Sequence, residues 1–103
     1  MANFVLVYHG GSMPDSPEEG AKVMQAWTDW FAQLGDKVVD GGNPASRTRR
    51  IASDGSVSDD PTGPSGYSII KAASIDEAVT LAKGCPVLAG GSAIQVVETF
   101  EAM

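Results

Sequence analysis

The chain has 103 residues, of which 43% are hydrophobic, and this length and composition predict one globular domain rather than two domains or a disordered chain. Thirteen acidic and seven basic residues give a formal charge of −6, which disfavours nucleic acid and anionic membrane surfaces as partners. One cysteine and one histidine leave no internal disulfide and no Cys/His metal constellation, so we expect no cofactor, no metal and a reducing, cytoplasmic location.

The first predicted element is a β-strand over residues 3–9. Apolar side chains occur on both faces of its alternation, which is typical of a central strand. The apolar run is too short for the core of a signal peptide, and no Lys or Arg precedes it. We therefore expect these residues to belong to the folded domain.

A helix is predicted to begin after Ser16, which suits an N-cap, with Pro17 at its first position and two acidic residues in its first turn. Gly35 is the expected end of this helix. An apolar stripe along the helix predicts a side that packs in the core, with an aromatic ligand site as the alternative. The stripe consists of Val23, Met24, Trp27, Trp30, Phe31 and Leu34.

The middle of the chain predicts short strands and turns. A strand is expected over residues 37–40, and a further, optional strand over residues 47–52 runs into an Asp54-Gly55 turn. The acidic segment 56–65 is rich in Pro and Gly and predicts an exposed loop.

The last third predicts a strand, a capped helix and a final strand. Residues 67–72 suit a half-buried strand, and residues 75–83 form an amphipathic helix. Ser74 and Glu77 have the spacing of a capping box, in which each side chain accepts a hydrogen bond from a backbone N–H that the other exposes. Residues 93–100 predict the last strand.

This order contains two strand-helix-strand halves and predicts an α+β fold of the ferredoxin-like βαββαβ plan, an antiparallel sheet with two helices on one face. Apolar side chains remain for the other face, and we expect them to be Val5, Val7, Ile70 and Val97 or their neighbours. We expect a second copy to cover that face in a symmetric homodimer.

Five residues are candidates for chemistry. His9 is the only imidazole and ends a strand, so it is a candidate acid or base, with a structural hydrogen bond as the alternative. Asp40 also ends a strand and is a candidate to orient His9, with a turn-forming role as the alternative. Tyr8, Tyr67 and Ser68 are candidate ligand-binding residues, again with structural hydrogen bonding as the alternative.

Other reactive or charged groups predict no site. Cys85 follows a helix rather than preceding one, so we expect a buried structural cysteine. The positive cluster of Arg47, Arg49 and Arg50 predicts a solvated strand or loop edge.

Taken in order, several separated segments resemble the YCII-related, or DGPF-domain, family (YciI-like proteins). The segments are residues 4–8, 16–19, 24–30, 38–42, 66–70, 74–78, 84–86 and 90–96. The resemblance covers nearly the whole chain as a single YCII-like domain, residues 1–103, and implies a ferredoxin-like fold that associates into a dimeric α/β barrel. Some members of this largely uncharacterised family resemble dehalogenating or lyase-type enzymes acting on small aromatic compounds. Others are encoded beside extracytoplasmic-function sigma factors.

Two departures from the family pattern affect function. The Asp-Gly-Pro-Phe signature is not intact, since residues 59–64 read Asp-Asp-Pro-Thr-Gly-Pro. The His-Asp pair proposed as catalytic in the YciI branch is replaced by Gln25 and Leu34. Two hypotheses follow: a small cytoplasmic enzyme with lyase- or dehalogenase-like acid/base chemistry on a small organic molecule near His9, or a non-catalytic dimeric ligand-binding or regulatory protein linked to sigma-factor signalling.

Overall fold

The computed structural model describes residues 1–11 and 14–102, and the α-helices and the strands of its main sheet follow the predicted order. In chain order they are β1 (Ala2–Gly10), α1 (Pro17–Leu34), the 3₁₀ helix η1 (Gly35–Lys37), β2 (Val38–Asp40), β3 (Arg49–Ile51), β4 (Val57–Asp59), β5 (Gly66–Ala72), α2 (Ile75–Ala82), the 3₁₀ helix η2 (Pro86–Leu88) and β6 (Ser92–Glu98). No helix in the described part of the chain is long and apolar enough to cross a membrane.

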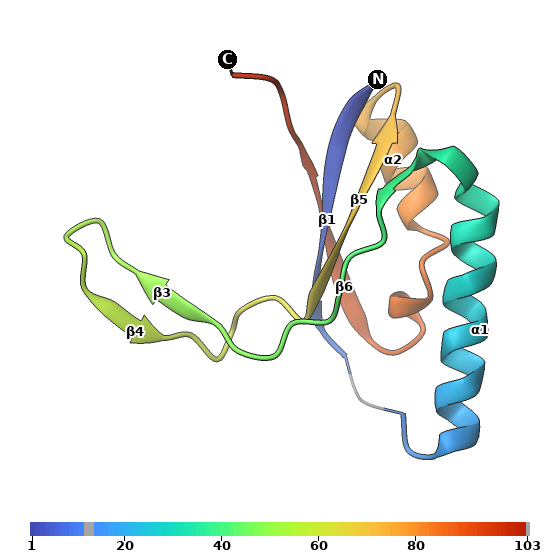
Figure 1. The fold of residues 1–103 in the computed structure, drawn as a ribbon, viewed down its shortest axis with the longest axis horizontal. Helices are drawn as coiled ribbons and strands as arrows, with labels where there is room; N and C mark the ends of the chain where they lie inside the picture. Colours follow the sequence, from blue (N-terminus) through green and yellow to red (C-terminus); the bar gives the residue numbers. More distant parts are fainter. Residues whose placement is uncertain (12–13, 103) are drawn as a thin grey trace.

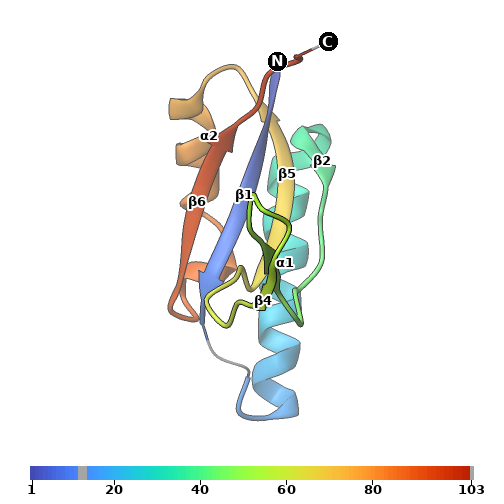
Figure 2. The same cartoon turned by 90° about the vertical axis from the view of Figure 1, so that its left-hand side faces the viewer.

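The main sheet has four strands in the order β2-β5-β1-β6, and every neighbouring pair is antiparallel. Both helices cover one face of this sheet (Figure 1). From the other side, β1, β5 and β6 lie in front of the helices, and no helix covers them (Figure 2). The arrangement is α+β and compatible with the ferredoxin-like plan, and β1 is central as predicted.

Alternation along β1 separates the two faces of the sheet. Phe4, Leu6 and Tyr8 are buried against the helices, whereas the residues between them are only half-buried. Phe4 pairs with Ile70 of β5, so Ile70 lies on the helix side and is fully buried. Ile70 itself therefore does not face away from the helices, and of the two expected alternatives its neighbour Ile69 occupies that position, because side chains alternate along a strand.

Helix α1 has the predicted ends, since Ser16 Oγ accepts a hydrogen bond from Glu19 N–H at 3.2 Å and Gly35 follows the last residue. Trp30 is buried and its Nε1–H donates to the Leu81 carbonyl at 3.1 Å, which joins the two helices. Val23 and Met24, however, are 41% and 67% exposed. The core prediction is wrong for these two residues because the first half of α1 extends beyond the end of the sheet (Figure 1).

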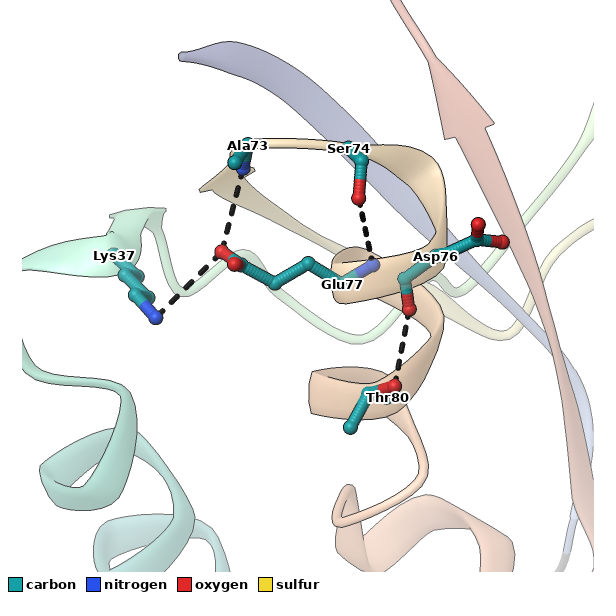
Figure 3. A network of polar contacts seen from close by, with 6 residues as sticks. All are labelled: Lys37, Ala73, Ser74, Asp76, Glu77 and Thr80. Atoms are coloured by element: carbon teal, nitrogen blue, oxygen red, sulfur yellow. Dashed lines mark hydrogen bonds and ion pairs between the residues drawn. The ribbon is translucent and has the colours of Figure 1, made fainter.

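A polar network surrounds the start of α2 (Figure 3). Ser74 Oγ accepts from Glu77 N–H at 3.1 Å, as the capping box requires. The Glu77 carboxylate instead accepts from Ala73 N–H, one residue before the N-cap, at 3.3 Å, and it lies 3.6 Å from the Lys37 ammonium. The reciprocal half of the capping box is thus shifted by one residue.

Residues 49–59 form a β-hairpin, which we call the arm. Arg49 pairs with Asp59 and Ile51 with Val57 across the two strands, and Gly55 in the turn has a φ of 88°. The predicted loop over residues 56–65 is therefore wrong for β4. The arm leaves the end of the sheet at which β1 finishes and projects on the side away from the helices (Figures 1 and 2).

Candidate functional site

The face of the sheet that no helix covers, which we call the open face, carries the residues that lie between the buried ones. Its members are Val5, Val7 and His9 of β1, Tyr67, Ile69 and Lys71 of β5, and Ala93, Gln95 and Val97 of β6. Val5 lies level with Ile69 on one side and Val97 on the other, so the middle of the face is apolar. Polar side chains are placed toward its two ends.

His9 lies on this face near the end of β1. Its Nε2 is 2.7 Å from Oε1 of Gln95 on β6. In the tautomer that carries the ring proton on Nε2, the imidazole donates this hydrogen bond to the amide oxygen, and the lone pair is then on Nδ1. The pair leaves Nδ1 as the nitrogen that can accept a proton.

Tyr67 completes the polar end of the open face. Val7 pairs with Tyr67 on β5 and with Gln95 on β6, so both side chains are diagonal neighbours of His9 across the strands. The Tyr67 side chain is 38% exposed. An acceptor nitrogen, a phenol and an amide therefore border a patch of apolar side chains, which suits a small, flat, hydroxylated molecule.

The predictions from sequence did not include Gln95. One signal was present: Gln95 is a polar residue inside an apolar strand, with Ile94 before it and Val96 after it. Its partnership with His9 depends on which strand pairs with β1 and in which register, and strand propensity does not give that information.

Asp40 is placed away from His9. It ends the edge strand β2, and its Oδ1 accepts from Gly42 N–H at 2.8 Å, which is a turn-forming contact. Asp40 is level with Ile69, and therefore with Val5, so two strand spacings and four residues separate it from His9, roughly 15 Å between Cα atoms. The two side chains do not form a hydrogen-bonded pair in this chain.

Tyr8 and Ser68 lie on the helix side of the sheet and are buried. The Tyr8 hydroxyl donates to Ser68 Oγ at 2.7 Å, and Ser68 Oγ donates to the Gly41 carbonyl at 2.8 Å. Burial raises the pKa of the Tyr8 phenol, while the hydrogen bond to Ser68 opposes this effect. The structure therefore divides the five candidate residues: His9 and Tyr67 share the open face, Tyr8 and Ser68 are turned to the core, and Asp40 is at the edge.

The aromatic stripe of α1 packs on Tyr8 rather than around an opening. The rings of Tyr8 and Trp27 meet edge to face with centroids 5.7 Å apart, and Trp27 lies 5.7 Å from Trp30 in the same manner. Burial raises the pKa of the nearby Cys85 thiol, which lowers its reactivity at neutral pH. These groups form part of the core.

Neither His9 nor Tyr67 lines the two hollows described next. The cleft between α2 and β6, which we call the α2–β6 cleft, has a volume of about 150 Å³ and is lined by Val79, Ala82, Lys83, Leu88, Ile94 and Val96. A wider hollow of about 350 Å³ at the base of the arm is lined partly by Arg47, Thr48 and Asp60. Among the described residues, no group of His, Cys, Asp and Glu side chains could hold a metal ion.

Comparisons with known proteins support the fold. No protein-family model and no curated protein matches the chain. Among solved structures it is similar to 5-chloro-2-hydroxyhydroquinone dehydrochlorinase from Burkholderia phenoliruptrix, determined in complex with 2,5-dihydroxybenzoquinone. The TM-score is 0.55 at 20% sequence identity, over 96% of this chain and 93% of that chain. At this identity the likeness establishes a common fold, and this fold agrees with the resemblance to YciI-like proteins.

Proposed function

We propose that this chain is a YciI-like, cytoplasmic homodimer that binds a small hydroxylated ring compound on its open face and performs acid/base chemistry on it with His9. The observation that carries the proposal is the His9–Gln95 contact of 2.7 Å at the border of an apolar surface. The contact holds the ring in one orientation with Nδ1 available as an acceptor.

Chemistry of this class needs few groups. In a dehydrochlorination, a base accepts a proton from the substrate, the electron pair of the broken bond to hydrogen forms a new double bond, and chloride departs with the electron pair of its bond to carbon. His9 Nδ1 is the acceptor in this proposal, Tyr67 donates a hydrogen bond to a ring oxygen, and Val7 contacts the ring face. We assign no step to Asp40, because it is bound to Gly42 N–H and lies far from His9 in the same protomer.

A second copy would enclose this site. Val5, Val7, Ile69 and Val97 form an apolar surface that no helix covers, and two such surfaces facing one another would exclude water from the middle of a dimeric α/β barrel. His9 would then be at the mouth of the enclosed space. The similar solved structure supports a ring ligand, since it is a dehydrochlorinase in complex with 2,5-dihydroxybenzoquinone.

A non-catalytic, ligand-binding or regulatory dimer is the second candidate. The observation that favours it is the partner of His9: the imidazole is held by a neutral amide, and among the described residues no carboxylate contacts it. An amide orients the ring but does not stabilise an imidazolium as a carboxylate does.

Calorimetric titration with 2,5-dihydroxybenzoquinone, together with chloride release from 5-chloro-2-hydroxyhydroquinone, tests both candidates. We expect the wild type to bind the quinone and His9→Gln to bind it about tenfold more weakly, the effect of one lost hydrogen bond. Lys71→Gln is the matched control, because Lys71 is at the opposite end of the same face, level with Asn3. Chloride release that is lost in His9→Gln supports the enzyme, and binding without release supports the second candidate. Equal binding by the wild type and His9→Gln contradicts the site.

A further inference from the structure

One face of the arm carries Ile51 and Val57 beside the Arg49–Asp59 ion pair, and nothing in the described structure covers the apolar pair. Ile51 and Val57 are directly opposite one another and are 72% and 58% exposed. Arg50 and Ser58 form the next pair and point to the other face of the hairpin. A two-stranded hairpin is only marginally stable alone in water, so a β-branched pair on one side indicates a surface that packs on another one.

The chain also exposes more surface than a folded monomer of its size. A monomer of 10.7 kDa is expected to expose about 5,500 Å², whereas this chain exposes 7194 Å². Its radius of gyration is 15.1 Å, compared with about 13 Å for a compact domain of this length. The excess of about 1,700 Å² is larger than the roughly 800 Å² that each partner buries in a standard interface.

The length of the arm determines which part of a facing copy it can contact. Pro44 is bridged to Gly66 at the edge of the sheet, and the seven residues from there to Ile51 span at most about 23 Å. Stacked sheets are about 10 Å apart, so the tip of an arm that passes a facing sheet arrives at the level of the partner's helices.

Symmetry selects the edge. The arm leaves beside the start of β5, where Pro44 is bridged to Gly66, at the end of the sheet where β1 finishes and β6 begins (Figures 1 and 2). If the twofold axis of the proposed dimer is parallel to the strands, it exchanges the two sheet edges and keeps this end in place, and the arm of one copy would then lie beside the start of β6 of the other. Ile94 near that start and Leu88 of η2 line the α2–β6 cleft.

We propose that the arm clasps a second copy of this chain by inserting Ile51 and Val57 into the α2–β6 cleft of that copy. This inference rests on the proposed homodimer and adds a second contact to it. The cleft is mostly apolar, and its volume of about 150 Å³ suits one or two β-branched side chains. Each protomer gives one arm and receives one, so the interface closes as a dimer.

Sedimentation equilibrium of three variants tests the proposal. We expect Ile51→Asp/Val57→Asp to weaken the dimer about 100-fold, because two charges would replace apolar anchors. Ser58→Asp places a charge on the other face of the same arm and is expected to leave the dissociation constant unchanged. Val7→Asp tests the open face itself. Since the arm makes no core contact, circular dichroism should show the same fold for both arm variants.

Cross-linking then locates the receiving surface. Ile51→Cys/Val79→Cys should give a covalent dimer with a short bismaleimide, whereas Ile51→Cys/Thr28→Cys, with its second thiol on the outer side of α1, should not. An unchanged dissociation constant for Ile51→Asp/Val57→Asp, or equal cross-linking of the two cysteine pairs, overturns the clasp. If Val7→Asp alone dissociates the dimer, the sheet-to-sheet dimer stands without the clasp. A wild type that is monomeric at micromolar concentration overturns both.

Discussion

Replacing Ser68 with alanine removes an oxygen that two other groups share. Ser68 Oγ accepts from the Tyr8 hydroxyl at 2.7 Å and donates to the Gly41 carbonyl at 2.8 Å. An unpaired buried hydroxyl costs about 1 to 3 kcal/mol, while the half-buried Gly41 carbonyl regains part of its hydration. We therefore expect Ser68→Ala to lower the free energy of unfolding by about 2 to 3 kcal/mol.

Tyr8→Phe isolates the other half of the pair. It leaves Ser68 bonded to Gly41 and keeps the ring in contact with Trp27, so the expected loss is about 1 kcal/mol. In the double variant no phenol is left unpaired, and its cost should be about 1 to 2 kcal/mol below the sum of the single costs.

Urea unfolding followed by tryptophan fluorescence measures all three costs, since Trp27 and Trp30 pack in the same aromatic cluster. Costs that add to within about 0.3 kcal/mol would refute a coupled buried pair. The same variants should bind 2,5-dihydroxybenzoquinone as the wild type does, because Tyr8 and Ser68 are on the helix side of the sheet. A weakened affinity would return both residues to the ligand site.

Three further predictions concern stability. Burial raises the pKa of Tyr8, so the native state favours the neutral phenol. The free energy of unfolding should therefore fall as pH rises above about 10, where the phenol of the unfolded chain ionises. In the Tyr67→Phe variant Tyr8 is the remaining tyrosine, and its phenolate absorbance should appear together with unfolding; phenolate absorbance in the folded protein near pH 10 would contradict this. Gly42→Ala should lower the free energy of unfolding by about 3 kcal/mol or more in urea, because Gly42 has a φ of 77° and an added Cβ would overlap the Tyr67 carbonyl oxygen. Gly55→Ala is the control: Gly55 has a φ of 88°, but an added Cβ would have no atom within 4 Å, so the expected cost is about 1 kcal/mol. Ser74→Ala should lower the free energy of unfolding by about 1 kcal/mol through loss of the N-cap of α2. An unchanged free energy of unfolding would show that this cap does not contribute to stability.

Local signals predicted the elements where they are chemically distinct. Ser16 and Ser74 accept hydrogen bonds from the N–H groups expected of N-caps, and Gly35 ends α1. The arm was missed in part because β4 has three residues with one apolar side chain among them, too short a pattern to separate a strand from a polar loop. Residues 57–59 are held as a strand by pairing with β3, which their own sequence does not indicate.

Pairing also decides which side of β5 faces the helices. Ile69 and Ile70 are adjacent and equally apolar, so strand propensity cannot assign one of them to the core. The register with β1 makes the assignment, since Phe4 is opposite Ile70 and Val5 is opposite Ile69. The partner of His9 depends on the same kind of information, because Gln95 reaches it only through the register of β6.

Tyr8 and His9 differ in role because the strand places their side chains on opposite faces of the sheet. They are adjacent in sequence, but alternation turns the Tyr8 phenol into the aromatic core and the His9 imidazole onto the open face. A substitution of Tyr8 is therefore expected to alter the free energy of unfolding, whereas a substitution of His9 is expected to alter ligand affinity. If the open face meets a second copy, ligand binding at His9 also depends on dimerisation. The affinity of the wild type for a ring ligand should then rise with protein concentration over the range in which the dimer forms. The Ile51→Asp/Val57→Asp variant should shift that dependence to higher concentration without altering the affinity reached by the dimer.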